Sequence, residues 1–284
     1  MPPRPRPLLT PTLRSHANPQ RRFLSTPAHA PATSLPEPPP QRWLSDLRAR
    51  IGKCLVFGCS PAQVSRAAVV LRAVATEWRQ LTAGSEGFLT GGRRGLEGHR
   101  IAWGEMDSFQ HVNNVNYIRY AETARVNWVT NFAVHVDPTH RRQWSELMTP
   151  KSVGLIMKSI KADYKLPMTY PDRISVYHKL RVAPSAEHAP TAFVLDCMIL
   201  SHAHRRVSAR TEEDIVLYDY KAARKAQMPE FMLEAFRETY RLQQEETART
   251  RGRIWDLIGT VEELEKETWD RDDAVEDLGS AARK

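Results

Sequence analysis

The spacing of the hydrophobic positions changes near residue 97, and this change divides the chain. Between residues 41 and 92, apolar side chains recur at three- and four-residue steps, which predicts helix with one apolar face. Ser60-Pro61-Ala62-Gln63 predicts a helix start, because a capping hydroxyl, a proline at the first helical position and a glutamine three residues after the cap satisfy unpaired amides. Gly84 stands where a C-terminal cap belongs. We expect residues 41–92 to form a helical extension.

Residues 97 to 220 have a different period. After a strand expected at about 100–105 and a helix-like run over 115–132, four stretches alternate apolar and polar positions, around 156–164, 174–182, 193–199 and 207–217. The connections are short enough for antiparallel neighbours. One strand, one long helix and four strands predict an α+β domain over residues 93–228, in which an antiparallel sheet wraps around a central helix.

The helical period returns over residues 229–284, where we expect a long amphipathic helix or helix pair that ends in an acidic tail. The net charge of the chain is +8, and residues 254–282 carry ten acids against two bases. The remainder is therefore strongly basic and suits polyanionic small molecules as well as RNA. No apolar run is long enough to span a bilayer.

The three cysteines are Cys54, Cys59 and Cys197. They are too few to staple a secreted domain, and their spacing fits no zinc-ligand pairing, so we interpret them as reduced thiols. We expect neither a metal nor a cofactor. The sequence contains no phosphate-cradling glycine motif, and it also lacks a serine-nucleophile elbow.

Residues 1–40 have the composition of a targeting segment. They contain 12 of the 20 prolines, five arginines and a single acid, Glu37, with hydroxylated residues between the arginines. This composition is typical of a mitochondrial transit peptide, and a secretory signal would need a continuous apolar stretch. The alternative is a disordered, proline-rich tail that is never cleaved. The first reading predicts a location in the mitochondrial matrix.

The segment from Trp103 to Tyr117 has the strongest chemical pattern. It leaves a strand, passes through Asp107 and His111, and reaches Asn113-Asn114, which are good N-cap residues, before the helix. Both ionisable side chains thus lie beside a helix N-terminus, where unpaired amides and the helix dipole can polarise a carbonyl oxygen. Such a site suits thioester hydrolysis. The alternative is that all these residues only cap the helix.

This segment resembles the hotdog-fold acyl-CoA thioesterases of the 4-hydroxybenzoyl-CoA thioesterase type and, more loosely, the plant acyl-ACP thioesterases. The similarity runs from Glu105-Met106-Asp107 through Gln110-His111-Val112-Asn113-Asn114 to Tyr117, continues in Glu122-Thr123-Ala124-Arg125, and covers about residues 97–240. Two positions depart from the family pattern. Glu105 replaces the commoner aspartate, and Phe109 stands where the acyl-ACP enzymes have an asparagine.

The resemblance implies a hotdog fold and a role for each matching position. Asp107 would be the catalytic carboxylate, acting as nucleophile or as general base, and His111 would orient the substrate or the carboxylate. Glu122 is a weaker catalytic candidate, because some subfamilies place their acid on the central helix. The resemblance also implies four substrate-binding residues, which are Asn113, Asn114, Val115 and Tyr117. The amides of residues 113–115 would polarise the thioester carbonyl.

The leading hypothesis is a mitochondrial thioesterase that hydrolyses an acyl-CoA or acyl-carrier thioester and assembles as a homodimer or larger oligomer, because a lone five-stranded sheet leaves an open edge. The rival hypothesis is a non-catalytic hotdog protein that serves as a binding or assembly subunit in the matrix, attached to a ribosome. Nucleic acid is a partner only in this rival, which rests on the helical additions at both ends and on the basic excess. A hydratase or dehydratase on the same fold is a third option.

Overall fold

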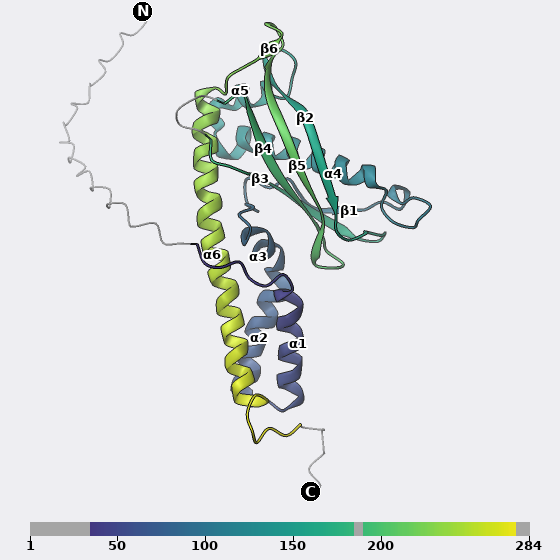
Figure 1. The fold of residues 1–284 in the computed structure, drawn as a ribbon, viewed down its shortest axis with the longest axis vertical. Coiled ribbons are helices and arrows are strands. Elements are labelled where there is room, and N and C mark those ends of the chain that lie inside the picture. Colours follow the sequence, from purple (N-terminus) through teal and green to yellow (C-terminus); the bar gives the residue numbers. More distant parts are fainter. Residues whose placement is uncertain (1–34, 185–189, 277–284) are drawn as a thin grey trace, which may run out of the picture. The chain divides into compact units, whose positions relative to one another are not determined.

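The structure, a computed structural model, describes residues 35–184 and 190–276 (Figure 1). Most of the segment predicted to be a targeting peptide and the end of the acidic tail lie outside these residues. Helices α1 (Trp43–Val56), α2 (Pro61–Thr76) and α3 (Trp78–Gly84) fill the N-terminal helical region. The capping box at the start of α2 is present, with the Ser60 hydroxyl and the Gln63 side chain accepting each other's backbone N–H.

The helix expected to run from Ser60 to Gly84 is divided at Glu77, so the prediction of one continuous helix was wrong. Gly84 is the last residue of α3 and does not follow the helix as a cap. The reason for the division is packing. The buried residues of α2 belong to a core shared with α1 and α6, whereas Trp78 is buried against Tyr177 and other side chains of the sheet.

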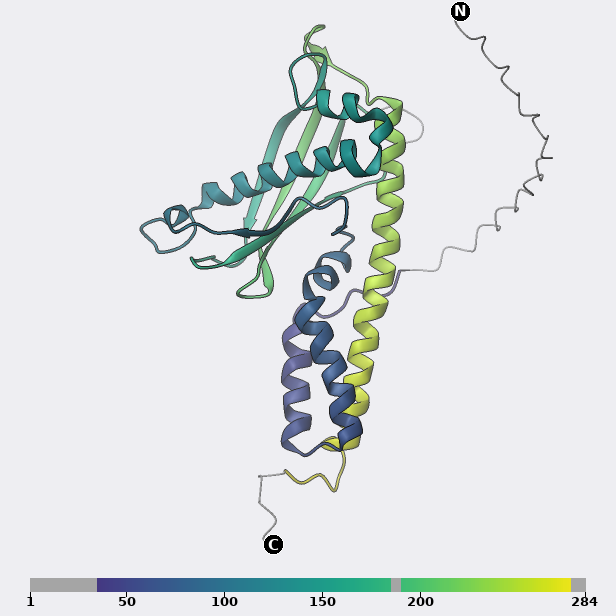
Figure 2. The same ribbon diagram turned by 180° about the vertical axis from the view of Figure 1, so that it is seen from behind.

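Five main strands form one antiparallel sheet. They are β1 (Leu96–Arg100), β2 (Val153–Tyr164), β3 (Arg173–Leu180), β4 (Ala192–Ser201) and β5 (Arg206–Asp219), arranged in the order β1-β3-β4-β5-β2. A two-residue strand, β6 (Arg224–Lys225), pairs with the end of β5. Helix α4 (Asn114–Asn131) packs across one face of the sheet (Figure 2). This is the predicted hotdog arrangement.

Several short elements follow the central helix and were not predicted. The segment η2 (Phe132–Val136) continues α4 with a wider turn, and η3 (Pro138–His140) and α5 (Arg141–Glu146) lead to β2. The single turn η1 (Trp103–Glu105) precedes α4. These pieces are too short to show a period in the sequence.

Helix α6 (Glu230–Thr268) is one continuous helix, which decides between the single helix and the helix pair. Near its start, Met232 and Phe236 pack with Trp128 and Phe132 over the sheet. Its second half packs with α1 and α2 in a separate core that includes Ile254, Leu257 and Val261. The helix is therefore shared by both cores (Figure 1). None of the helices in the described residues is sufficiently long and apolar to cross a membrane.

Candidate active site

A tight turn between β1 and α4 sets the position of Asp107. Its N–H donates to the carbonyl of His111 at 2.9 Å, and its own carbonyl accepts from the N–H of Gln110 at 3.0 Å. Gln110 has a φ of 63°, a left-handed conformation that closes the turn. The carboxylate atom Oδ1 accepts from the N–H of Phe109 at 2.9 Å, so one of its two oxygens serves the turn. No hydrogen bond to protein is recorded for the other oxygen, Oδ2, among the described residues.

The start of α4 is capped as the sequence predicts. Asn113 is the N-cap, and its Oδ1 accepts from the N–H of Val115 at 3.0 Å. The N–H of Asn113 itself donates to the carbonyl of Glu105 at 2.9 Å. Of the three amides expected to polarise a substrate carbonyl, two are thus already occupied. The N–H of Asn114 has no acceptor within the described residues and is the amide that a ligand can use.

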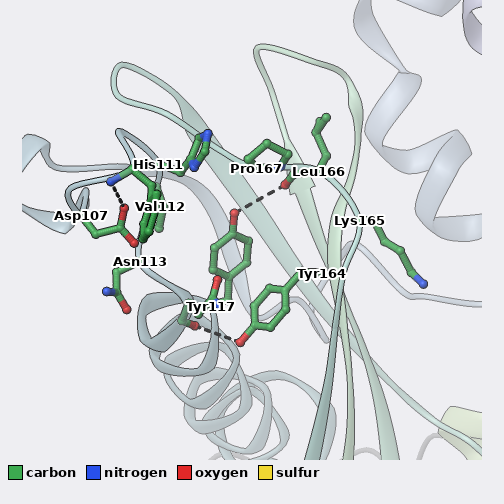
Figure 3. A pocket seen from close by; sticks show the side chains of 11 residues that line it. Asp107, His111, Val112, Asn113, Tyr117, Tyr164, Lys165, Leu166 and Pro167 are labelled. Atoms are coloured by element: carbon green, nitrogen blue, oxygen red, sulfur yellow. Dashed lines mark hydrogen bonds between the residues drawn. The ribbon is translucent and has the colours of Figure 1, made fainter.

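Two tyrosines form a wall beside this helix start. The hydroxyl of Tyr117 accepts from the N–H of Met168 at 3.1 Å and lies 3.5 Å from the carbonyl of Leu166. Burial raises the pKa of Tyr117, so it remains a neutral phenol. The hydroxyl of Tyr164 donates to the carbonyl of Asn114 at 3.3 Å. Together they hold the segment after β2 against the N-terminus of α4 (Figure 3).

A cleft of about 490 Å³ opens at this place, between the turn, the start of α4 and the segment that follows β2. Its lining comprises Asp107, Phe109, His111, Val112, Asn113, Asn114, Tyr117, Tyr164, Lys165, Leu166 and Pro167. Asp107 is half-buried, and the cleft beside it is open. In Figure 3 the Asp107 carboxylate points toward the side of Asn113, and the His111 ring points away from it.

The cleft brings together most of the predicted site residues. Asp107, His111, Asn113, Asn114 and Tyr117 line it, whereas Val115 and Glu122 are not part of its lining. Val115 contributes its N–H to the cap, and its side chain is exposed. Glu122 is exposed on α4, two turns beyond the cap.

Sequence reasoning missed the other wall of the cleft. This wall consists of Tyr164, which ends β2, and of Lys165, Leu166 and Pro167, which follow it. It lies almost 60 residues after Asp107 in the sequence, and no local pattern links the two segments. Lys165 had no distinguishing mark among the many bases on or beside the strands. The structure separates them, because Lys158 and Arg181 form ion pairs with Asp214 and Asp196 while Lys165 lines the cleft.

Glu105, the departure from the expected aspartate, has a structural role. One of its carboxylate oxygens accepts from the Tyr120 hydroxyl at 2.8 Å and from the N–H of Ala102 at 2.7 Å. Burial and the neighbouring Glu105 carboxylate both raise the pKa of Tyr120, which therefore donates the hydrogen bond. Glu105 anchors the turn that carries Asp107 and is outside the cleft lining.

Comparison with known proteins agrees with this architecture. Residues 101–236, which carry the cleft, match the thioesterase-like superfamily. Among solved structures, a DHNA-CoA thioesterase from Staphylococcus aureus is 12% identical, with a TM-score of 0.41 over 54% of this chain and 94% of its own. A 1,4-dihydroxy-2-naphthoyl-CoA thioesterase from Synechocystis is 16% identical, with a TM-score of 0.41 over 50% and 95%. No curated protein matches the chain.

Proposed function

We propose that the chain hydrolyses the thioester of an acyl-CoA or of an acyl group on a carrier protein, with Asp107 as the catalytic carboxylate. One observation carries this proposal: Asp107 and Asn114, whose N–H is unpaired among the described residues, line the same open cleft at the N-terminus of α4. The match to the thioesterase-like superfamily supports the same reaction class.

The reaction follows from these groups. Oδ2 of Asp107 takes a proton from water, and the hydroxide attacks the thioester carbonyl carbon. The oxygen of that carbonyl gains negative charge and is stabilised by the N–H of Asn114 and the positive end of α4. The intermediate then expels the thiolate, which takes the proton from Asp107, and the products are a carboxylic acid and a thiol. His111, which belongs to the same turn as Asp107 and also lines the cleft, positions the substrate.

Lys165 belongs to the other wall of the cleft, and its positively charged side chain extends away from Asp107 (Figure 3). Both acyl-CoA and a carrier protein present the acyl group on an arm that carries phosphate, and an ammonium group can bind phosphate as a point charge. We assign Lys165 to substrate binding on this ground. Its replacement should therefore weaken substrate binding more than it slows turnover.

The test is hydrolysis of short, medium, long and aromatic acyl-CoAs by the purified chain and by the Asp107→Asn variant. We expect turnover to fall by about 10²- to 10⁴-fold, the usual contribution of a general base, with the circular dichroism spectrum unchanged. Glu122→Gln is the matched control, because that carboxylate is outside the cleft lining, and its turnover should stay within about threefold of the original.

Equal hydrolysis by the Asp107→Asn variant would show that the carboxylate is wrongly assigned. No hydrolysis of any thioester, together with sedimentation on a large ribonucleoprotein that disappears in high salt, would favour the rival role as an assembly subunit. That result would leave the superfamily match intact, since a fold can persist without its chemistry.

We also propose that two copies pair. Strands β1 and β2 form the edges of the sheet, and β2 presents 12 residues with an open side among the described residues. Near the cleft, Trp103, Phe109 and Val115 expose 73%, 78% and 61% of their surfaces, an apolar group that a second copy would cover. Light scattering should give twice the 32.4 kDa of one chain. A mass of one chain at micromolar concentration would contradict the pairing.

We propose the mitochondrial matrix as the location, on the composition of residues 1–40. A fusion of these residues to a fluorescent protein should enter mitochondria and be shortened there. A fusion that stays in the cytosol at full length would contradict this proposal and leave the enzymatic one untouched.

A further inference from the structure

A group of polar side chains is enclosed beneath the middle of α4, apart from the cleft lining. His178 on β3 pairs in register with Cys197 on β4, which pairs with Thr211 on β5. Glu213 lies two residues further along β5 and so faces the same side of the sheet. His178, Cys197 and Glu213 are each exposed by at most 1%. Water therefore does not reach these three groups.

Glu213 is held from two directions. The guanidinium of Arg125, on α4, donates to its Oε2 at 2.7 Å, and the Thr211 hydroxyl donates to its Oε1 at 3.1 Å. Burial on its own raises the pKa of Glu213, but His178 and Arg125 lower it further, so the carboxylate is ionised. Arg125 and Thr211 thus fix the orientation of this carboxylate within the cluster.

The histidine is much less well satisfied. Its Nε2 lies 3.4 Å from each carboxylate oxygen of Glu213, and its Nδ1 has no partner among the described residues. A charge-assisted N–H···O bond normally measures about 2.7–2.9 Å. Two ligands on one tetrahedral zinc ion, with bonds of about 2.0–2.2 Å, stand roughly 3.4 Å apart. The observed spacing therefore suits two ligands of one ion better than a direct ion pair.

We propose that His178, Cys197 and Glu213 form a buried binding site for a divalent transition metal, with zinc as the best fit. The three ligand atoms lie within 4.8 Å of one another, and no other such group of three occurs within residues 35–184 and 190–276. A thiolate, an imidazole and a carboxylate favour zinc over magnesium or calcium. Arg125 and Thr211 would then act as the outer groups that orient a ligating carboxylate.

Metal binding requires a deprotonated thiol and a neutral imidazole, so it would release any proton that these ligands carry in the metal-free protein. The metal would join three strands under the central helix and so stabilise the fold.

No sequence pattern indicates this site, because its ligands come from three separate strands. His178, Cys197 and Glu213 are 19 and 16 residues apart, and register pairing alone brings them together. Metal motifs are recognisable in a sequence when ligands cluster on one turn or loop.

The experiment uses the full chain with Cys54→Ala and Cys59→Ala, which leaves Cys197 as its only cysteine. This variant is unfolded in denaturant with a chelator and refolded with cobalt(II), because the buried site is closed in the folded protein. We expect about one cobalt per chain by elemental analysis, with the visible bands of a tetrahedral ion and a thiolate charge-transfer band that must come from Cys197. Zinc should then displace the cobalt spectrum.

A Cys197→Ser change in the same background should abolish the charge-transfer band and weaken cobalt binding at least about tenfold. Binding of less than about 0.1 cobalt per folded chain of the Cys54→Ala, Cys59→Ala variant would overturn the proposal and identify the cluster as a metal-free ion network. Cobalt bound without the thiolate band would overturn it as well. Neither outcome depends on hydrolytic activity.

Discussion

Two regions of α4 use polar groups in opposite ways. At its N-terminus, an Asp107 oxygen and the Asn114 amide have no protein partner within the described residues, and both residues line an open cleft. At its middle, Arg125 pairs with Glu213, whose carboxylate is fully buried between the sheet and the helix. The polar groups at the N-terminus can therefore bind a ligand, whereas Arg125 and Glu213 bind each other inside the fold. The same helix thus serves chemistry at one place and structure at another.

The largest expected effect comes from breaking the buried pair. Arg125→Met should lower the free energy of unfolding by about 3–5 kcal/mol, because it leaves the buried Glu213 carboxylate without its closest partner, at 2.7 Å. Arg119→Met is the matched control on the same helix, since Arg119 is exposed and bonds only the Asn116 side chain among the described residues, at 3.1 Å. Its cost should stay below about 1 kcal/mol. Urea unfolding followed by circular dichroism measures both.

If the Arg125→Met and Arg119→Met variants lose the same stability, the Arg125–Glu213 pair does not contribute more to stability than an exposed hydrogen bond does. The contrast between the two regions of α4 would then be one of exposure alone.

The cleft wall should give the next largest effect. Tyr117→Phe removes the hydroxyl that accepts from the N–H of buried Met168 and should cost about 1–3 kcal/mol, the penalty for an unsatisfied buried donor. Tyr164→Phe removes an exposed hydroxyl whose bond to Asn114 is 3.3 Å long, so its cost should be a few tenths of a kcal/mol. Thermal unfolding of both variants tests the difference. A larger loss of stability in Tyr164→Phe than in Tyr117→Phe would mean that the exposed hydroxyl of Tyr164 stabilises this wall of the cleft more than the buried hydroxyl of Tyr117 does.

The two asparagines at the start of α4 separate capping from catalysis. Asn113→Ala removes the N-cap and should lower stability by about 1 kcal/mol. Asn114→Ala keeps both the cap and the backbone N–H, so stability and turnover should change little. Unfolding and hydrolysis assays on the same preparations decide this. A large loss of turnover in Asn114→Ala with unchanged stability would assign catalysis to its side chain in place of its amide.

The sequence predicted what depends on local order. The alternating strands, the central helix and the Asn113 cap all follow from neighbouring residues, and the structure contains them. The family resemblance located Asp107 and His111, which the structure places in one cleft. The break at Glu77 was missed because burial of Trp78 against the sheet, not any local helix signal, decides it.

Contacts across the fold were beyond the sequence for the same reason. Lys165 reaches the cleft from beyond β2, and Arg125 meets Glu213 across 88 residues. The sequence also could not predict which backbone amides are free to bind a ligand. The N–H of Val115 is not free, because it donates to the Asn113 side chain, and this depends on the side-chain geometry of Asn113. Pairings of this kind are set by register and tertiary packing, which single-sequence patterns do not encode.

The smallest effect should come just beyond η2, where Asp137 accepts from Trp144 at 3.0 Å and from His140 at 2.9 Å. Partial burial raises the pKa of Asp137, but these hydrogen bonds lower it further, below its ordinary value of 3.8. The unfolded chain then binds the proton more tightly. The stabilisation is complete above pH 3.8 and disappears as the pH falls through the lower folded-state pKa. In the Asp137→Asn variant, the free energy of unfolding should therefore fall less steeply as the pH is lowered. The control is Asp163→Asn, which removes an exposed carboxylate 3.7 Å from Lys161 and should leave this pH dependence as it is. Identical acid limbs in the native chain and the Asp137→Asn variant would show that acid unfolding starts elsewhere.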